Sequence, residues 1–232
     1  MASIASDNGK SLVAKAVEAV KAHIRESGLR VGDTLPGEGY FADKLGVSRA
    51  VMREAFGALA ALRLIDVANG RRAKVGALDG SVIADSLEHA LSTAQIRVAD
   101  VWDVRRTIEM RTAALAALNA TPVQAARIVA LAEAMSKDDQ PHDATTEDDI
   151  EFHLAIAEAS GNALFNQIVV SFVPLMRVAV PRAWGTRHTD EEKSDILDRH
   201  RRLAWAIANR DPEEAERCMA MHFDEAIGAL LR

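Results

Sequence analysis

The stretch GDTLPGEGYFADKLGVSRAVMREAF, residues 32–56, contains the signals that decide the fold of the N-terminal part of the chain. Pro36 suits the start of a short helix over about 36–45, and Gly46 suits its end. Ser48 follows two positions later, and its hydroxyl can accept a hydrogen bond from a free N–H in the first turn of a second helix. A helix, a tight turn and a capped helix predict a helix-turn-helix.

The second helix of this motif divides into an apolar and a basic side. Arg49 and Arg53 lie in its first two turns, on the side opposite the apolar residues. A recognition helix enters the major groove with its N-terminal residues, so both arginines could reach phosphates or the N7/O6 edge of guanine. Solvated surface arginines are the alternative. The predicted buried stripe consists of Val51, Ala55, Leu59 and Leu62.

Both flanks of the motif complete a small domain. Upstream, residues 11–27 have apolar side chains at helical spacing, and Gly28 is a plausible stop. Downstream, the apolar runs LIDVA and RRAKV flank Asn69-Gly70, which is the strongest short-range hairpin signal. Arg71 and Arg72 lie at the tip, as in a wing that tracks DNA. We therefore expect a winged helix-turn-helix over residues 10–76.

Composition and charge favour a mainly α protein with two tasks. The chain has 232 residues, 49% of them hydrophobic and only 4% aromatic, with Ala and Leu prominent. Residues 1–75 carry 12 Lys/Arg against 8 Asp/Glu, whereas residues 76–232 carry 16 against 26, within a net charge of −6. A basic module joined to an acidic one suggests a nucleic-acid partner for the first, although chance fluctuation is the alternative.

Several features bear on location. The single cysteine, Cys218, excludes an internal disulfide and suggests a reducing compartment. The N-terminus has no apolar core of signal-peptide length, and no window approaches the roughly 20 apolar residues of a membrane span. We expect a soluble, cytoplasmic protein with no membrane partner.

The rest of the chain predicts an all-α antiparallel bundle over residues 98–232, after a linker and connecting helix over 77–97. We expect a polar loop at SKDDQPHDATTE, residues 136–147, and an irregular segment at PRAWGTRHTDEEK, residues 181–193. The expected helices run from 98 to a stop near Thr121-Pro122, then over 122–137, 147–160, 162–180, 190–209 and 212–231.

One stretch of the bundle has a spacing that could bind a metal ion. In DDIEFHLAIAEASGN, residues 148–162, Asp149 and His153 are four positions apart, so both side chains leave the same face of a helix. A solvated helix face is the alternative for such a pair. An enzyme would need a general base near the metal. Glu151 lies on the wrong face for that role, Glu158 is the other carboxylate nearby, and no HExxH pattern occurs, so we expect no catalysis.

The N-terminal motifs resemble the DNA-binding domain of the GntR family of bacterial transcription regulators. The resemblance implies DNA contacts from Ser48, Arg49, Arg53 and the wing residues Gly70, Arg71 and Arg72. It departs at Gly39, where the family often places a DNA-contacting Arg. The matching residues are Leu35, Pro36, Glu38, Ala42, Leu45, Gly46, Val47, Ser48, Arg49, Arg53, Glu54 and Ala55.

The bundle resembles the ligand-sensing (FCD-type) domain of the FadR-like branch of that family. The motifs VWDVRRTIEMRTAALAA and DIEFHLAIAEASGN carry this resemblance, together with a His in each of the last two helices. It covers residues 11 to 229, approximately. Metal-binding members use one Asp and three His, which fall here on Asp149, His153, His200 and His222. Such donors suit Zn²⁺, and alternatively Ni²⁺, Fe²⁺ or Mn²⁺. Core histidines satisfied by hydrogen bonds are the alternative.

The same resemblance places Arg105 and Asn162 near an effector pocket, Arg105 facing the carboxylate of a ligand. A salt bridge to Glu109 is the alternative for Arg105, and a turn or cap is the alternative for Asn162. Trp184 could close over a ligand or simply pack.

The predicted function is a homodimeric repressor that binds a palindromic double-stranded DNA operator. Its affinity for the operator would be controlled by a small carboxylate, such as a sugar acid, a hydroxy acid or a dicarboxylate, bound beside a divalent metal. A regulator of the same fold that responds to acyl-CoA is the alternative, and a metal-dependent enzyme is a more distant one.

Overall fold

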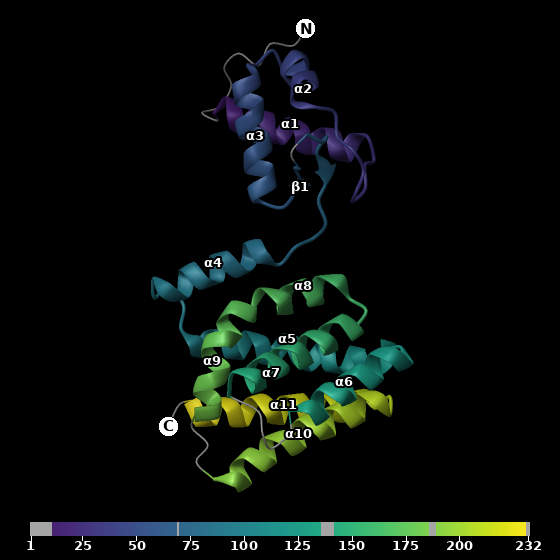
Figure 1. The fold of residues 1–232 in the computed structure, drawn as a ribbon, viewed down its shortest axis with the longest axis vertical. Coiled ribbons are helices and arrows are strands. Elements are labelled where there is room, and N and C mark those ends of the chain that lie inside the picture. Colours follow the sequence, from purple (N-terminus) through teal and green to yellow (C-terminus); the bar gives the residue numbers. More distant parts are fainter. Residues whose placement is uncertain (1–10, 69, 136–141, 186–188, 231–232) are drawn as a thin grey trace. The chain divides into compact units, whose positions relative to one another are not determined.

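The computed structural model describes residues 11–68, 70–135, 142–185 and 189–230, without the side chains of 142–145, 182–184, 190, 193 and 226–230. The chain forms two compact units, Met1–Asp79 and Gly80–Arg232, which we describe separately (Figure 1).

The N-terminal unit consists of three helices and a short hairpin. The helices are α1 (Leu12–Glu26), α2 (Glu38–Leu45) and α3 (Arg49–Ala61), and the strands are β1 (Ile65–Asp66) and β2 (Lys74–Val75). The predicted turn signals are confirmed: Gly46 ends α2 with a left-handed φ of 66°, and the Ser48 hydroxyl accepts a hydrogen bond from the Val51 N–H at 3.3 Å. The start of α2 differs slightly, because Gly37 rather than Pro36 precedes its first residue.

The buried side of α3 is rotated from the predicted stripe. Val51 is only half-buried, and Leu62 is 51% exposed because it lies beyond the end of the helix. The buried face still follows the 3.6-residue period of a helix, but it includes Met52 and Phe56, which the prediction omitted. The buried residues of α3 are Met52, Ala55, Phe56 and Leu59.

The hairpin has the predicted antiparallel pairing, with Ile65 opposite Val75 and Asp66 opposite Lys74. Gly70 has a φ of 71°, as its turn position requires, whereas Asn69 lies outside the described residues. Beyond the hairpin the chain passes close to the end of α3. A Cβ at Gly76 would lie 2.3 Å from the carbonyl oxygen of Arg63, so only glycine fits there.

The described part of the C-terminal unit is all helical. Its helices are α4 (Ser81–Ser92), α5 (Val98–Asn119), α6 (Pro122–Ala134), α7 (His142–Ala159), α8 (Ala163–Ser171), α9 (Val173–Gly185), α10 (Asp190–Ala208) and α11 (Pro212–Leu230). Helix α5 is central, because it packs against both α7 and α11 (Figure 1). About half of the buried residues in the main core of this unit are alanines, so its helices approach one another closely.

Three boundaries differ from the sequence predictions. Helix α7 starts at His142, so the second half of the predicted polar loop, residues 142–147, is helical, whereas residues 136–141 lie outside the described residues. The predicted single helix over 162–180 is two helices, α8 and α9, bent by 51°. Pro174 explains the break, since it lacks the N–H that a continuous helix would use and fits the first turn of a new one. The helix α9 then continues through Pro181 to Gly185, where we expected irregular structure.

Among the described residues, no single helix has both the length and the apolar character needed to cross a membrane. Only the bent pair α8 and α9 passes such a test, by length and composition together.

Helix α4, expected as a connecting helix, packs against α8 and α9. The Gly80 N–H donates to the Gln167 side-chain oxygen at 2.7 Å. A Cβ at Gly80 would lie 2.4 Å from the Gln167 carbonyl oxygen. The start of α4 can therefore lie this close to the backbone of α8 only with glycine at position 80. Helix α4 is therefore part of the second unit.

Candidate metal centre

Four potential metal ligands from three helices meet inside the C-terminal unit. Asp149 and His153 lie one turn apart on α7, and they meet His200 from α10 and His222 from α11. All four are at least 93% buried, and one ligand atom of each lies within 4.8 Å of the others. A solvated helix face is therefore excluded for Asp149 and His153.

Hydrogen bonds orient two of the imidazoles. The Nδ1–H of His200 donates to the Ile196 carbonyl oxygen at 2.8 Å, and Nδ1 of His153 faces the carboxylate of Glu109. In the neutral ring this arrangement puts the free lone pair on Nε2 of both histidines. Such bonds to the outer nitrogen are the usual way in which proteins orient metal-binding histidines.

The inner atoms of the cluster lack adequate partners for a site without a cation. Nε2 of His200 lies 3.1 Å from Asp149 Oδ1, and Nε2 of His153 lies 3.9 Å from Asp149 Oδ2. Nε2 of His153 and Nδ1 of His222 have no hydrogen-bond partner among the described residues. Lone pairs that face one another in a buried site are unfavourable unless a cation or a proton lies between them.

The size of the cluster also fits a metal ion. At bond lengths of about 2.1 Å, ligands on opposite sides of a metal lie roughly 4.2 Å apart. Adjacent ligands lie about 3.0–3.4 Å apart, so pairs within the 4.8 Å limit found here would contract by about 0.6 Å if they are opposite and by less than about 2 Å if they are adjacent. One carboxylate and three imidazoles can therefore bind a divalent ion of the Zn²⁺, Ni²⁺, Fe²⁺ or Mn²⁺ type.

The protonation states suit metal binding, because metals bind carboxylates and neutral imidazoles. Burial lowers the pKa of His222 well below its usual value, and the neighbouring His200 and His153 add to this effect. Burial alone would raise the pKa of Asp149, but the contact with His200 and the nearby His153 and His222 hold it far below its usual range.

Glu109 is the residue that sequence reasoning underrated. Its side chain is 1% exposed and connects two groups, since one oxygen accepts from Arg105 Nε at 2.7 Å and the other faces Nδ1 of His153. Burial opposes its ionisation, but Arg105 and His153 together hold the pKa of Glu109 below its usual value. The sequence suggested the contact with Arg105 through the i, i+4 spacing, but it gave no signal for the contact with α7.

Arg105 forms the predicted alternative, the salt bridge with Glu109, and still has a free donor. Its guanidinium lies 4.8 Å from the centre of the Trp102 ring and 5.1 Å from that of Phe223. Arg105 Nη2 and Trp102 Nε1 are both buried and lack a hydrogen-bond partner among the described residues. Both residues line a cavity of ≈10 Å³ between α4, α5 and α9, which holds about one water molecule.

The remaining predicted pocket residues lie elsewhere. Asn162 is exposed and caps α8, since its side-chain oxygen accepts from the N–H groups of Leu164 and Phe165. The alternative of a cap is confirmed, and Asn162 does not line the cavity beside Arg105, while a role near an effector stays a prediction. The side chain of Trp184 lies outside the described residues. Glu151 and Glu158 are exposed, and both pair with Arg127 rather than facing the cluster.

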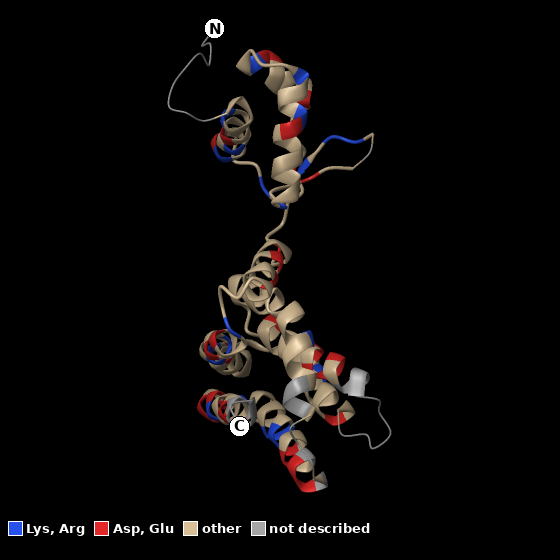
Figure 2. Cartoon of the chain, turned by 90° about the vertical axis from the view of Figure 1, so that its left-hand side faces the viewer, with Lys and Arg blue, Asp and Glu red and all other residues tan. Residues whose placement is uncertain are grey.

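The predicted DNA-binding residues lie on the surface of the N-terminal unit. Ser48, Arg49 and Arg53 are exposed at the start of α3, and Gly70, Arg71 and Arg72 are exposed on the hairpin. Arg53 has only a loose ion pair with Glu38, at 3.9 Å. Figure 2 shows basic residues along the hairpin and on α3.

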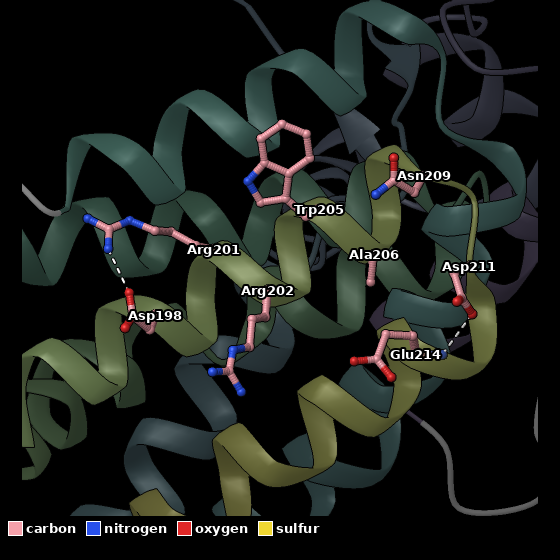
Figure 3. A pocket seen from close by; sticks show the side chains of 8 residues that line it. All are labelled: Asp198, Arg201, Arg202, Trp205, Ala206, Asn209, Asp211 and Glu214. Carbon is pink, nitrogen blue, oxygen red and sulfur yellow. Dashed lines mark hydrogen bonds and ion pairs between the residues drawn. The ribbon is translucent and has the colours of Figure 1, made fainter.

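A separate, wider groove of ≈520 Å³ lies on the outside of α10 and α11 (Figure 3). Its polar residues are exposed or half-buried: Trp205 is 53% exposed, and Arg201 is already paired with Asp198 at 2.7 Å. None of the four metal-ligand candidates lines this groove. Its size exceeds that of the buried cavity, but it offers no buried polar group to a ligand.

Two family matches cover most of the chain. Residues 12–75 match the family described as "Bacterial regulatory proteins, gntR family", and residues 100–225, more than half of the chain, match the FCD domain. The Glc operon transcriptional activator of Escherichia coli K12 is 29% identical over 222 residues, which are 93% of this chain and 87% of that protein.

Other relatives agree with this assignment. The regulator LutR of Bacillus subtilis is 27% identical over 86% of this chain and 92% of its own length. The galactonate operon transcriptional repressor of E. coli K12 is 29% identical, over 80% of this chain and 82% of that protein. A solved structure of a Streptococcus agalactiae GntR protein has a TM-score of 0.65 at 24% identity, covering 92% of this chain and 97% of that one, and supports the fold.

All these relatives are named as transcription regulators rather than enzymes. A GntR-type winged helix-turn-helix precedes an FCD domain in this chain, which therefore belongs to the GntR family of transcription regulators.

Proposed function

We propose that this regulator is a repressor whose affinity for its operator is controlled by a small carboxylate bound beside a divalent metal. The observation that carries the proposal is the buried cluster of Asp149, His153, His200 and His222, with ligand atoms within 4.8 Å of one another. An ordinary helical core has no reason to bury three imidazoles and a carboxylate against each other.

DNA recognition is proposed for the exposed basic residues of the N-terminal unit. Arg49 and Arg53 at the start of α3 suit contacts in the major groove, and Arg71 and Arg72 suit the backbone or the minor groove. Ser48 caps α3 and is exposed beside them. A regulator that reads chromosomal DNA would act in the cytoplasm, in keeping with the single cysteine.

The charge of the site favours an anionic effector. A divalent ion, Asp149, Glu109 and Arg105 together have a net charge of +1, since the metal-bound imidazoles are neutral. A carboxylate would neutralise this charge. Arg105 Nη2 is a buried donor that has no partner among the described residues, and Arg105 is connected to the metal cluster through Glu109. When bound, the metal supplies a positive centre for an oxygen of the effector.

We propose a homodimer that binds a palindromic operator, because two-fold regulators read paired half-sites. The effector would shift the population between DNA-competent and incompetent states. The named relatives include an activator and a repressor, and we propose repression relieved by the effector. The buried histidines and the small cavity favour a small carboxylate over the alternative of acyl-CoA.

Metal analysis and DNA binding test the proposal together. The purified protein should contain about one divalent ion per chain by elemental analysis, and His200→Ala should lose it. His89→Ala, an exposed histidine on α4, is the matched control and should retain the metal. A fully metallated His200→Ala protein would contradict the site.

Arg49→Ala tests the DNA contact separately. It should weaken binding to the genomic operator in a fluorescence anisotropy titration, while leaving metal content unchanged. Unchanged operator affinity would refute the role of Arg49. A screen of carboxylates by thermal shift, with and without chelator, then identifies the effector as the acid that raises the melting temperature only with metal present.

A further inference from the structure

Arg63 has a backbone conformation that its residue type disfavours. It lies just beyond the end of α3 with a φ of 56°, in the left-handed region where helices usually end on glycine. The Cβ of any other residue crowds the backbone there, so an arginine at this position destabilises the turn. Such outliers persist where the surrounding structure compensates for them. We therefore expect the side chain of Arg63 to have a role that glycine could not fill.

A second arginine of the chain shows how such a residue can act. In the part of the chain that the structure describes, the other non-glycine residues with positive φ are Ala94 and Arg210. Arg210 lies just beyond the end of α10 with a φ of 58°, and its guanidinium donates to the carbonyl oxygens of Leu118 and Ala120 at 3.1 and 3.0 Å. An arginine in a left-handed turn can therefore hold a second segment of the chain against the end of its own helix.

The side chain of Arg63 contacts the segment through which the chain leaves the N-terminal unit. Its Nε lies 3.5 Å from Oδ2 of Asp79, the last residue of that unit. The same turn also holds the segment through its backbone, because the Gly76 N–H donates to the Leu64 carbonyl oxygen at 3.0 Å. Residues 76–79 are thereby held at both ends against the end of α3.

The backbone hydrogen bond and the ion pair fix different things. The bond at Gly76 fixes where the segment begins, whereas the ion pair at Asp79 fixes the direction in which the chain continues. Leu78 lies between them and is 55% exposed, so packing of its side chain does not set this direction. The side chains of the ion pair are 58% and 38% exposed. A pair of this kind contributes at most about 5-fold to an equilibrium, so it favours one direction and can still open.

We propose that Arg63 and Asp79 determine which spacing of operator half-sites the regulator prefers. Each chain of a dimer leaves its DNA-binding unit through residues 76–79, so the direction of this segment relative to α3 limits where the two recognition helices can lie. A dimer that reads paired half-sites selects their separation by this geometry. Arg63 is thus a positioning residue for α3. This inference rests on the proposed function, because it assumes a dimer on a palindromic operator.

Operators of altered spacing test the inference. Selection from random duplex DNA with the unmodified full-length protein gives the preferred palindrome, and its half-sites are then moved closer together or further apart by single base pairs. Affinity for each duplex would be measured by fluorescence anisotropy. Arg63→Gly suits the positive φ and removes the ion pair. It should reduce the preference for the optimal spacing by about 3- to 25-fold, since a dimer contains two such pairs.

Charge reversal supplies a rescue and a control. Arg63→Glu should weaken the spacing preference in the same way, and the double variant Arg63→Glu with Asp79→Arg should restore it, because the ion pair is rebuilt in the opposite sense. Lys21→Glu is the matched control, since it makes the same change in charge at the exposed pair with Glu18 on α1. It should weaken binding to all spacings by one common factor and leave the preference unchanged.

The results separate this inference from the proposed function. If folded Arg63→Gly keeps the spacing preference, or if the reversed pair does not restore the preference lost in Arg63→Glu, the inference is wrong while a DNA-binding regulator stands. A uniform loss of affinity in Arg63→Gly at every spacing would make Arg63 a DNA contact and would also overturn it. If the unmodified protein selects no palindrome, or binds all spacings equally, the proposed dimer on paired half-sites is wrong and the inference falls with it.

Discussion

Glu109→Gln gives the sharpest test of how the buried site is held together. The substitution keeps the shape of the side chain and removes its charge. Arg105 is 2% exposed and its Nε lies 2.7 Å from Glu109, so its positive charge would then be buried without a counter-charge. Breaking a buried pair in this way costs about 3–5 kcal/mol of the free energy of unfolding.

The assay is thermal unfolding in chelator, followed by zinc titration. For a domain of the size of the C-terminal unit, about 2–4 °C per kcal/mol converts this loss to a fall in melting temperature of roughly 6–20 °C. Zinc affinity should also fall by about 10- to 100-fold, because the partner that orients His153 through Nδ1 has changed.

Glu151→Gln is the matched control on α7. Its side chain is 51% exposed and its partner is the exposed Arg127, so its loss should cost less than about 1 kcal/mol. If Glu109→Gln destabilises the protein no more than this control does, the carboxylate is not compensating a buried charge. If zinc affinity is unchanged as well, Glu109 does not orient His153.

Three further substitutions or reactions test other parts of the structure. Ser48→Ala removes the cap of α3 and should lower the free energy of unfolding of the N-terminal unit by about 1 kcal/mol in urea denaturation; no change would mean that the cap is replaced by water. Gly80→Ala places a Cβ 2.4 Å from the Gln167 carbonyl oxygen and should cost about 1–3 kcal/mol by thermal denaturation, whereas Gly57→Ala, with open space around it, should be neutral or stabilising. Burial, with a hydrogen bond to Glu214, raises the pKa of the Cys218 thiol to about 11, so the group stays protonated at pH 8.5, where an ordinary thiol is about half ionised. Its alkylation by iodoacetamide at that pH should be roughly 100-fold slower than in the urea-unfolded chain, and equal rates would show that the thiol is accessible and unperturbed.

The N-terminal unit was largely predictable because its signals are local. Gly46 and Ser48 each specify a backbone feature within a few residues, and the structure shows both. The break at Pro174 was missed although the same kind of signal was present. Apolar residues continue on both sides of Pro174 and indicate one helix, whereas the preference of proline for a first helical turn is the signal for the break.

The metal ligands and the residues that hold them in place depend on contacts between helices, which local sequence signals do not specify. His200 and His222 could be assigned only through resemblance to a family, because no spacing links them to Asp149. The role of Glu109 could not be predicted, since its contact with His153 joins two helices 44 positions apart in sequence. Burial of Arg105 likewise depends on the packing of Trp102 and Phe223 around it, which no sequence period encodes.

The two glycines at the junction have a mechanical consequence. Gly76 lies against the backbone of Arg63 and Gly80 against that of Gln167, so only three residues separate them, and one of these, Asp79, pairs with Arg63 at 3.5 Å. Under the proposed control of DNA binding by the effector, this short connection would carry a shift from one unit to the other. Inserting a few flexible residues after Ala77 should therefore leave both halves intact and still able to bind their ligands, while occupancy of one no longer alters the other.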